Sequence, residues 1–215
     1  MKLVIGDKNY SSWSMRPWLV LKHFGVPFEE RTIELQEADS TTSILALSPS
    51  GKVPCLITDD NVHVWDSLAI CETLAEQFAQ HAMWPRDPAT RAQARSVSAE
   101  MHSGFVGLRS SMWMNIRASF PGKGATPEAL ADIARVDALW CDCIAQHGGP
   151  FLFGDFSIAD AMYAPVVMRF NTWQPALSAG AAAYARRVTE HPAVRAWIDD
   201  ALRETHRVPH YDVCA

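Results

Sequence analysis

The sequence has no long hydrophobic run, no CxxC motif and no concentration of positive charge. No stretch approaches the roughly 18 apolar residues of a membrane-spanning helix, and the apolar run near the first residue is too short for a secretory signal. We therefore expect neither membrane insertion nor export. Without a basic cluster, nucleic acid is not expected as a partner. The eight histidines are scattered, and we expect no metal site.

The cysteines are odd in number and irregular in spacing, which suits neither a disulfide framework nor a zinc knuckle. We expect reduced thiols in a cytoplasmic protein. They are Cys55, Cys71, Cys141, Cys143 and Cys214. Among 215 residues, 48% are hydrophobic and 20% are charged, with a net charge of −5, so the chain has a globular rather than a disordered composition. Its length allows one large domain or two modest ones.

The hydrophobic pattern changes near residue 80. Before that point, strand-like runs alternate with helical ones, and a polar turn at residues 59–61 joins two runs as a hairpin. The expected strands cover residues 2–5, 28–33, 54–58 and 62–65, and the expected helices cover 16–24, 40–47 and 67–78. This β-α-β, α, β-β-α order predicts an α/β domain over residues 1–79. A proline-containing linker follows at 80–89.

Residues 90–215 are expected to form an all-α domain. Thr126 and Pro127 are a typical helix start, and Gly148 is a typical stop. The expected helices cover residues 89–119 (bent near Gly104 and Gly107), 127–147, 157–170, 179–190 and 192–204. Ser157 and Asp160 have the spacing of a capping-box variant, to which we assign a structural role.

Three serines, Ser11, Ser12 and Ser14, join the first strand to the first helix. A hydroxyl at a helix N-terminus lies where free backbone N–H groups and the helix dipole favour an anion. Simple helix capping is the alternative interpretation. The GxSxG motif of hydrolases is absent, so a nucleophilic serine is not expected. A serine here could instead donate its proton to an anion held beside it.

Two further segments carry polar groups at strand ends. The Val53-Pro54 bond before a strand is a candidate cis peptide, which would turn the Val53 backbone groups outward beside the positive charge of Lys52. A plain turn with a surface lysine is the alternative. Asp66 and Ser67 stand where a strand meets a helix, so that Asp66 could pair with an ammonium group and Ser67 could bind a carboxylate.

Together these segments suit one ligand with an amino-acid end, a peptide middle, a second carboxylate and a thiolate. The chain resembles the cytosolic glutathione transferases over essentially its whole length. The segments that carry the resemblance are SPSGKVP (48–54), WDSLAI (65–70) and GDFSIAD (154–160). The serine segment 11–16 is most similar to the zeta class, whose members usually carry cysteine where this chain has Trp13.

The resemblance implies a thioredoxin-like first domain, an all-helical second domain, glutathione as co-substrate and a homodimer. It also implies that Ser11 assists the glutathione thiol, with Ser12 as second choice, and that Trp13, Lys52, Val53, Pro54, Asp66 and Ser67 bind glutathione. A free thiol has a pKa near 8.5, and lowering it by roughly 2 units requires about 2.7 kcal/mol. One charge-assisted hydrogen bond and a helix dipole can supply that amount.

The electrophile site is expected between the domains, with Met112, Trp113 and Arg117 as its lining. An apolar core stripe is an equally good interpretation of Met112. Arg117 and Arg169 could attract an acidic co-substrate, or could be solvated surface charges. The expected function is a detoxifying glutathione transferase acting on a hydrophobic or acidic electrophile. The alternatives are a cis-trans isomerase of the maleylacetoacetate type, a glutathione-dependent disulfide reductase and a non-catalytic interaction module.

Overall fold

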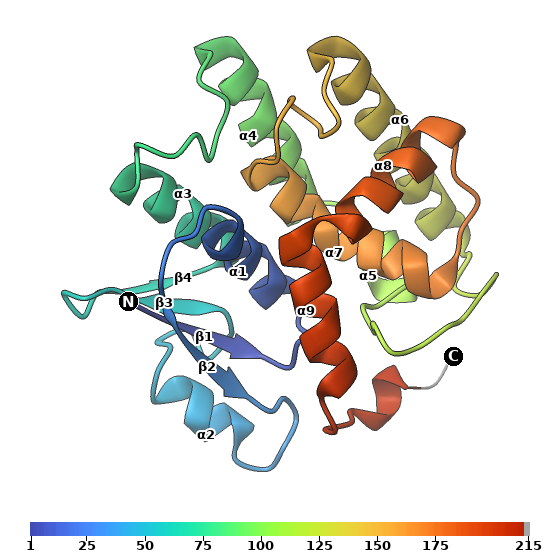
Figure 1. Ribbon diagram of the computed structural model, residues 1–215. Helices are drawn as coiled ribbons and strands as arrows, with labels where there is room; N and C mark the ends of the chain where they lie inside the picture. Colours follow the sequence, from blue (N-terminus) through green and yellow to red (C-terminus); the bar gives the residue numbers. More distant parts are fainter. Residues whose placement is uncertain (213–215) are drawn as a thin grey trace.

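The computed structural model describes residues 1–212, so that Cys214 lies outside the described residues. The chain forms a four-stranded sheet with its own helices, followed by a helical part (Figure 1). The elements of the first part are β1 (Lys2–Gly6), α1 (Ser12–His23), β2 (Glu29–Ile33), α2 (Ser40–Leu45), β3 (Cys55–Ile57), β4 (His63–Trp65) and α3 (Ser67–Gln77). This order confirms the predicted α/β arrangement, and the hairpin of β3 and β4 lies where the turn at residues 59–61 predicts it.

The sheet has the strand order β2-β1-β3-β4, with β1 parallel to β2 and antiparallel to β3. Successive side chains of a strand point to opposite faces. Leu3 and Ile5 of β1 therefore enter the large core that also contains the buried residues of α1 and α3, whereas Val4 packs in a smaller cluster with Ile44 of α2. The sheet is thus covered on both faces, with α1 and α3 on the face that meets the helical part (Figure 1).

The helical part begins at Pro88 and contains no strand within the described residues. Its elements are α4 (Pro88–Ser103), α5 (Val106–Ser111), α6 (Pro127–His147), α7 (Ile158–Trp173), α8 (Ala179–Glu190), α9 (Pro192–Arg203) and a short 3-10 turn (Pro209–Tyr211). Helix α6 has the predicted bounds because Thr126 accepts a hydrogen bond from the Ala129 amide and Gly148 ends the helix in the left-handed region.

The bent helix predicted over residues 89–119 is instead two separate helices followed by an irregular segment, and the break between the helices lies at the predicted bend. Helix α4 ends at Ser103, Phe105 adopts a left-handed conformation with φ of 54°, and α5 ends at Ser111. The segment that follows makes its hydrogen bonds to distant parts of the chain instead, for example from the Phe120 amide to the Thr172 carbonyl at 2.7 Å. Tertiary contacts of this kind override local helix propensity.

Helix α7 joins the two parts, because it packs against both α1 and α4 and is buried along almost its whole length. Its start is fixed by Asp160, whose carboxylate accepts from the Ser157 amide at 2.9 Å, as the capping-box spacing predicts. The fully buried Asp160 also accepts from the Leu152 amide at 3.0 Å and from the Tyr184 hydroxyl at 3.0 Å. Across residues 1–212, no helix combines the length and the hydrophobicity needed to cross a bilayer.

Candidate functional site

A cleft lies where the sheet meets the helical part, and it has two compartments. The first, of about 570 Å³, is lined by Trp13, Ser50, Lys52, Val53, Pro54, Trp65, Asp66, Ser67 and Arg109. The second, of about 620 Å³, is lined by Ser11, Ser12, Trp113, Met114, Arg169 and Tyr211 among others. The two compartments share Trp13, Lys52, Val53 and Arg109, so they are neighbours in one cleft.

The Val53-Pro54 peptide bond is cis, as the sequence predicts. It lies immediately before β3, and Val53 lines both compartments while Pro54 lines the first. Lys52 also lines both. A backbone amide and carbonyl beside a lysine ammonium form a site for an extended, peptide-like ligand with a carboxylate.

The start of α3 presents Asp66 and Ser67 to the first compartment. Asp66 has a positive φ of 76° and caps α3 by accepting from the Leu68 amide at 2.9 Å. Its other oxygen lies 3.2 Å from the His102 imidazole of α4, and 44% of its side chain stays exposed. Ser67 is buried, and its hydroxyl accepts from the Arg16 guanidinium at 3.3 Å. The carboxylate of Asp66 remains open to an ammonium group of a ligand.

The loop serines occupy the second compartment and differ in their partners. The Ser11 hydroxyl donates to the Ser14 hydroxyl at 2.7 Å, and the Ser14 oxygen also accepts from the Gly6 amide at 3.1 Å. The Ser12 hydroxyl accepts from the Arg169 guanidinium at 3.3 Å. Neither Ser11 nor Ser12 lies beside a histidine or carboxylate in the hydrogen bonds of residues 1–212. The loop can therefore polarise an anion, but it holds no nucleophile–base pair.

Three arginines surround this loop. The guanidinium carbons of Arg16 and Arg109 lie 4.1 Å and 5.3 Å from the ring centroid of Trp13. Burial first, and the charge of a neighbouring arginine second, lower the pKa of Arg16 to about 9 and that of Arg169 to about 10. Both groups are still cations at neutral pH. Within the described part of the chain, neither of them pairs with a carboxylate at ion-pair distance.

The structure places two of the predicted electrophile residues elsewhere. Met112 is 1% exposed and belongs to the core, and it lines neither compartment. The Arg117 guanidinium donates to the Tyr10 hydroxyl at 3.0 Å and to the carbonyls of His206 and Glu204, so it holds the segment after α9 against the first loop. It does not line the cleft either.

Trp113 does line the second compartment, and its indole N–H donates to the Tyr211 carbonyl at 2.8 Å. Sequence reasoning gave no role to Arg109 or Arg16, and it named Arg169 only as a possible attractor of an acidic co-substrate. The motif around Ser11 contains Arg16, which could have directed attention to it. Arg109 and Arg169 come from α5 and α7, and no local signal connects those helices to the serine loop.

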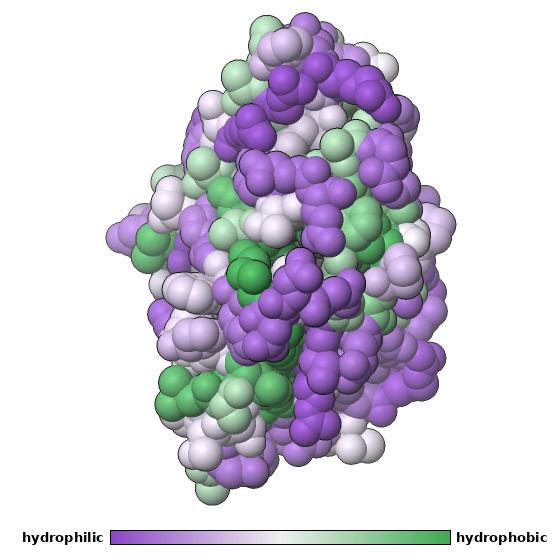
Figure 2. Space-filling view, turned by 90° about the vertical axis from the view of Figure 1, so that its left-hand side faces the viewer, coloured by the Kyte–Doolittle hydropathy of each residue, from purple (hydrophilic) through white to green (hydrophobic). Residues whose placement is uncertain are grey.

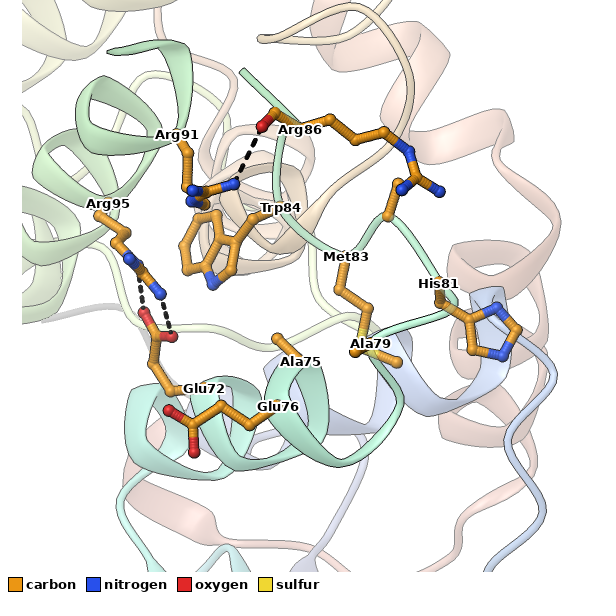
Figure 3. Close-up of a pocket in the computed structure, with 11 residues that line it drawn as sticks. Glu72, Ala75, Glu76, Ala79, His81, Met83, Trp84, Arg86, Arg91 and Arg95 are labelled. Carbon is orange, nitrogen blue, oxygen red and sulfur yellow. Dashed lines mark hydrogen bonds and ion pairs between the residues drawn. The ribbon is translucent and has the colours of Figure 1, made fainter. Parts of the chain in front are cut away.

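A third cavity, of about 260 Å³, lies between α3 and the start of α4 (Figure 3). Glu72 and Arg95 form a two-pronged ion pair there, with both distances 2.9 Å, and Arg91 donates to the Arg86 carbonyl at 3.0 Å. The Trp84 ring stands 5.8 Å from the Arg95 guanidinium. None of the predicted site residues lines this cavity. Its ion pair holds the sheet domain's last helix to the first helix of the helical part.

The cysteines stand apart from this chemistry. Cys55, Cys71, Cys141 and Cys143 are free thiols. Burial raises the pKa of Cys71 well above its usual range, and it raises the pKa of Cys143 to about 11. Both thiols are therefore protonated and unreactive at neutral pH. None of these four cysteines lines either compartment of the cleft.

Comparison with known proteins identifies the family of the chain. The family model described as glutathione S-transferase, N-terminal domain, matches residues 10–77, and the corresponding C-terminal domain model matches residues 123–200. A probable maleylacetoacetate isomerase of Caenorhabditis elegans is 30% identical over 176 residues, which cover 80% of this chain and 79% of that protein. The chain therefore belongs to the glutathione S-transferase family.

Other similarities extend over nearly the full length. Glutathione S-transferase GstB of Escherichia coli K12 is 25% identical over 201 residues, covering 90% of this chain and 96% of that protein. A crystal structure of a glutathione transferase homolog from Burkholderia, with bound glutathione, aligns with a TM-score of 0.71 at 24% identity and covers 94% of this chain and 97% of that one. This structural likeness shows that the fold is shared.

Proposed function

We propose that the protein binds glutathione in the cleft and joins the glutathione sulfur to a small electrophile as a thioether. The observation that carries the proposal is that the serine loop, the cis Val53-Pro54 bond and the Asp66-Ser67 corner border one two-compartment cleft. Family membership and the glutathione-bound Burkholderia homolog support the identity of the ligand. The remaining site assignments follow from matching each end of that tripeptide to the groups that line the cleft.

The two charged ends of glutathione would lie in the first compartment. The ammonium group of its α-amino acid end pairs with Asp66, and the carboxylate of that end receives hydrogen bonds at the start of α3 beside Ser67. The peptide middle pairs with the backbone of Val53, and the glycine carboxylate meets Lys52. The cysteine sulfur then lies toward the second compartment, near Ser11 and Ser12.

The serine loop would act by stabilising the thiolate. A serine hydroxyl is no base, so the thiol proton leaves to solvent, and the hydroxyl donates a hydrogen bond to the sulfur that remains. The sulfur lone pair attacks an electrophilic carbon, a thioether bond forms, and the leaving group departs with its electron pair. Lowering the thiol pKa by roughly 2 units raises the thiolate from a few per cent to a majority at pH 7.

The electrophile would occupy the second compartment, beside Trp113 and Arg109. An aromatic wall suits a hydrophobic co-substrate, and the arginine suits an acidic one. A glutathione-dependent cis-trans isomerase is the second candidate, because two relatives of this chain are named maleylacetoacetate isomerases: the Caenorhabditis elegans protein, and one of Pseudomonas aeruginosa that is 31% identical over 119 residues. In that reaction glutathione adds, a bond rotates, and glutathione leaves unchanged.

A two-part experiment tests the proposal. Binding to immobilised glutathione is measured first, and a chloronitroaromatic, a hydroperoxide, a mixed disulfide and maleylacetone are then assayed in parallel. Thioether formation is the expected result. Isomerisation of maleylacetone without thioether accumulation would establish the second candidate. Binding without any turnover would leave a non-catalytic glutathione-binding module.

A homodimer, in which the sheet part of one subunit meets the helical part of the other, belongs to the same proposal. Two large apolar side chains near the β3–β4 hairpin are exposed, Val62 at 54% and Trp65 at 48%. Figure 2 views the molecule from the side on which that hairpin lies in Figure 1, and it shows hydrophobic surface among hydrophilic bands. A mass of two chains in light scattering is the expected result, and a single-chain mass at micromolar concentration would contradict it.

A further inference from the structure

The two serines of the loop do not have equal freedom to donate a proton. The Ser11 hydroxyl proton is directed at the Ser14 oxygen, 2.7 Å away. Ser14 in turn accepts from the Gly6 amide, so this chain of bonds ties Ser11 back to the end of β1. A hydroxyl carries one proton, and a Ser11 that donates to Ser14 has none left for a ligand.

Ser12 is bonded in the opposite sense. A guanidinium has only donors, so the 3.3 Å contact from Arg169 must use an oxygen lone pair of Ser12. The Ser12 proton is then free to point into the second compartment, which Ser12 lines. A hydroxyl that accepts from a cation also becomes a stronger donor, because hydrogen bonds in a chain polarise one another.

The position of Arg169 beside this serine costs free energy, because it buries a cation. It comes from α7, 157 residues further along the chain, and it is 7% exposed. Its guanidinium also donates to the Pro165 carbonyl at 3.3 Å, and its Nε–H has no partner in the part of the chain that the structure describes. A buried cation without a carboxylate is normally avoided, so a fold that retains one invites a functional explanation.

We propose that Ser12, and not Ser11, donates the hydrogen bond to the glutathione thiolate, and that Arg169 is the positioning residue that orients and polarises Ser12. This inference rests on the proposed glutathione transfer reaction. Helix α7 of the second domain thereby supplies part of the thiol site of the first. The thiol proton still leaves to solvent, and Arg169 keeps its own protons throughout.

The test compares the pKa of the bound thiol in four variants: Ser12→Ala, Ser11→Ala, Arg169→Met and the Ser12→Ala/Arg169→Met double variant. The ultraviolet absorbance of the thiolate at saturating glutathione, followed from about pH 5 to about pH 9, gives that pKa directly. The pH profile of kcat for a chloronitroaromatic gives it a second time. Arg186→Met, on the exposed face of α8, is the matched control for loss of an arginine.

A hydrogen bond to a charged acceptor shifts an equilibrium by about tenfold to a hundredfold. Ser12→Ala is therefore expected to raise the thiol pKa by about one to two units, and Arg169→Met by about one unit. Ser11→Ala and Arg186→Met should leave it within about 0.3 units. In the Ser12→Ala background, Arg169→Met should add almost nothing, because Arg169 acts through Ser12.

Each alternative result overturns a stated part of the inference. A larger shift in Ser11→Ala than in Ser12→Ala returns the donor role to Ser11. Additive shifts in the double variant mean that Arg169 acts on the sulfur through space and not through Ser12. Loss of thermal stability in Arg169→Met with an unchanged thiol pKa assigns Arg169 to structure alone. A wild-type protein that does not bind glutathione refutes the proposed function itself, which is a separate and recognisable outcome.

Discussion

A pair of neutral histidines fastens the two halves of the molecule together, and it should make the protein lose stability in mild acid. His191 caps α9 by accepting from the Ala193 amide at its Nδ1. Its proton must then be on Nε2, which lies 3.0 Å from the Nδ1 of His23 on α1. His191 also stacks on Phe156 at 4.2 Å. Protonation of His23 at Nδ1 would place two donors face to face, and protonation of His191 at Nδ1 would remove the acceptor that caps α9.

The sign of the pH effect follows from the pKa of His191, which burial, and then the charge of His23, lower to about 4. Burial lowers the pKa of His23 as well. The stability that neutral His191 contributes is fully present above the unfolded pKa of about 6.5. It is lost as pH falls toward 4, because only the unfolded chain takes up protons in that window. Each pH unit costs about 1.4 kcal/mol per proton, so about 2 kcal/mol is lost at pH 5. Allowing about half for solvent screening of the partly exposed ring leaves about 1 kcal/mol.

The variant His191→Asn isolates this effect, because asparagine caps a helix as well as any residue and does not titrate in this range. Urea unfolding of the wild type and the variant is measured at about pH 7.5 and about pH 5 at one protein concentration, since association would otherwise shift the midpoints. We expect the stability lost between the two pH values to be about 1 kcal/mol smaller in the variant. His210→Asn, at an exposed position, is the control.

Wild type and His191→Asn would lose the same stability between the two pH values if His191 had no part in the effect, with His210→Asn again behaving like the wild type. The acid sensitivity would then come from other groups, and the two histidines would not affect the pH dependence of stability. An increase of stability on acidification would be a sharper contradiction, because it would mean that the folded state binds the proton more tightly than the unfolded chain.

Three further outcomes follow from the geometry. Ser157→Ala removes a hydroxyl that donates to Asp160 at 3.1 Å, and it should lower the free energy of unfolding by about 1 kcal/mol while leaving the pKa of bound thiol unchanged, as chemical denaturation and thiolate absorbance would show. Asp66→Asn keeps the cap of α3 but removes the charge offered to the ligand's ammonium group, and steady-state kinetics should give a roughly tenfold higher KM for glutathione with kcat little changed. Gly124→Ala forces an L side chain into a positive φ of 68° with its Cβ 2.6 Å from the Ser111 carbonyl oxygen, and thermal unfolding should show a loss of about 1–3 kcal/mol.

The fold was predictable where local signals suffice. Helices α6 and α8 have their predicted bounds because a capping residue, an apolar stripe and a terminating signal lie within one short segment. The helix predicted over residues 89–119 failed because its second half bonds to partners far away in the sequence. Asn115, for example, is 1% exposed and accepts from the Asn9 side chain at 2.9 Å, more than 100 residues away. Periodicity contains no information about such a partner.

The candidate site also has one part that local sequence predicts and one part that depends on distant contacts. The cis bond at Val53-Pro54 and the polar pair Asp66-Ser67 could be predicted because each consists of adjacent residues. The structure brings them into one cleft. What the sequence cannot express is the difference between Ser11 and Ser12, because it depends on an arginine from α7. Two neighbouring hydroxyls look equivalent until the fold supplies each with a different partner.

The arginines around Trp13 show how the protein accommodates this arrangement. Removing a cation from water is costly, and Arg16 recovers part of that cost through the face of Trp13 at 4.1 Å and the Ser67 hydroxyl at 3.3 Å. Arg169 has weaker compensating contacts, since it donates to the Pro165 carbonyl and to the Ser12 hydroxyl, both at 3.3 Å. The positive charge of Arg169 also lowers the pKa of Arg16, because two nearby cations repel one another. Of the two groups to which Arg169 donates, Ser12 alone lines the second compartment, so under the proposal above Arg169 acts on a bound thiolate through that hydroxyl.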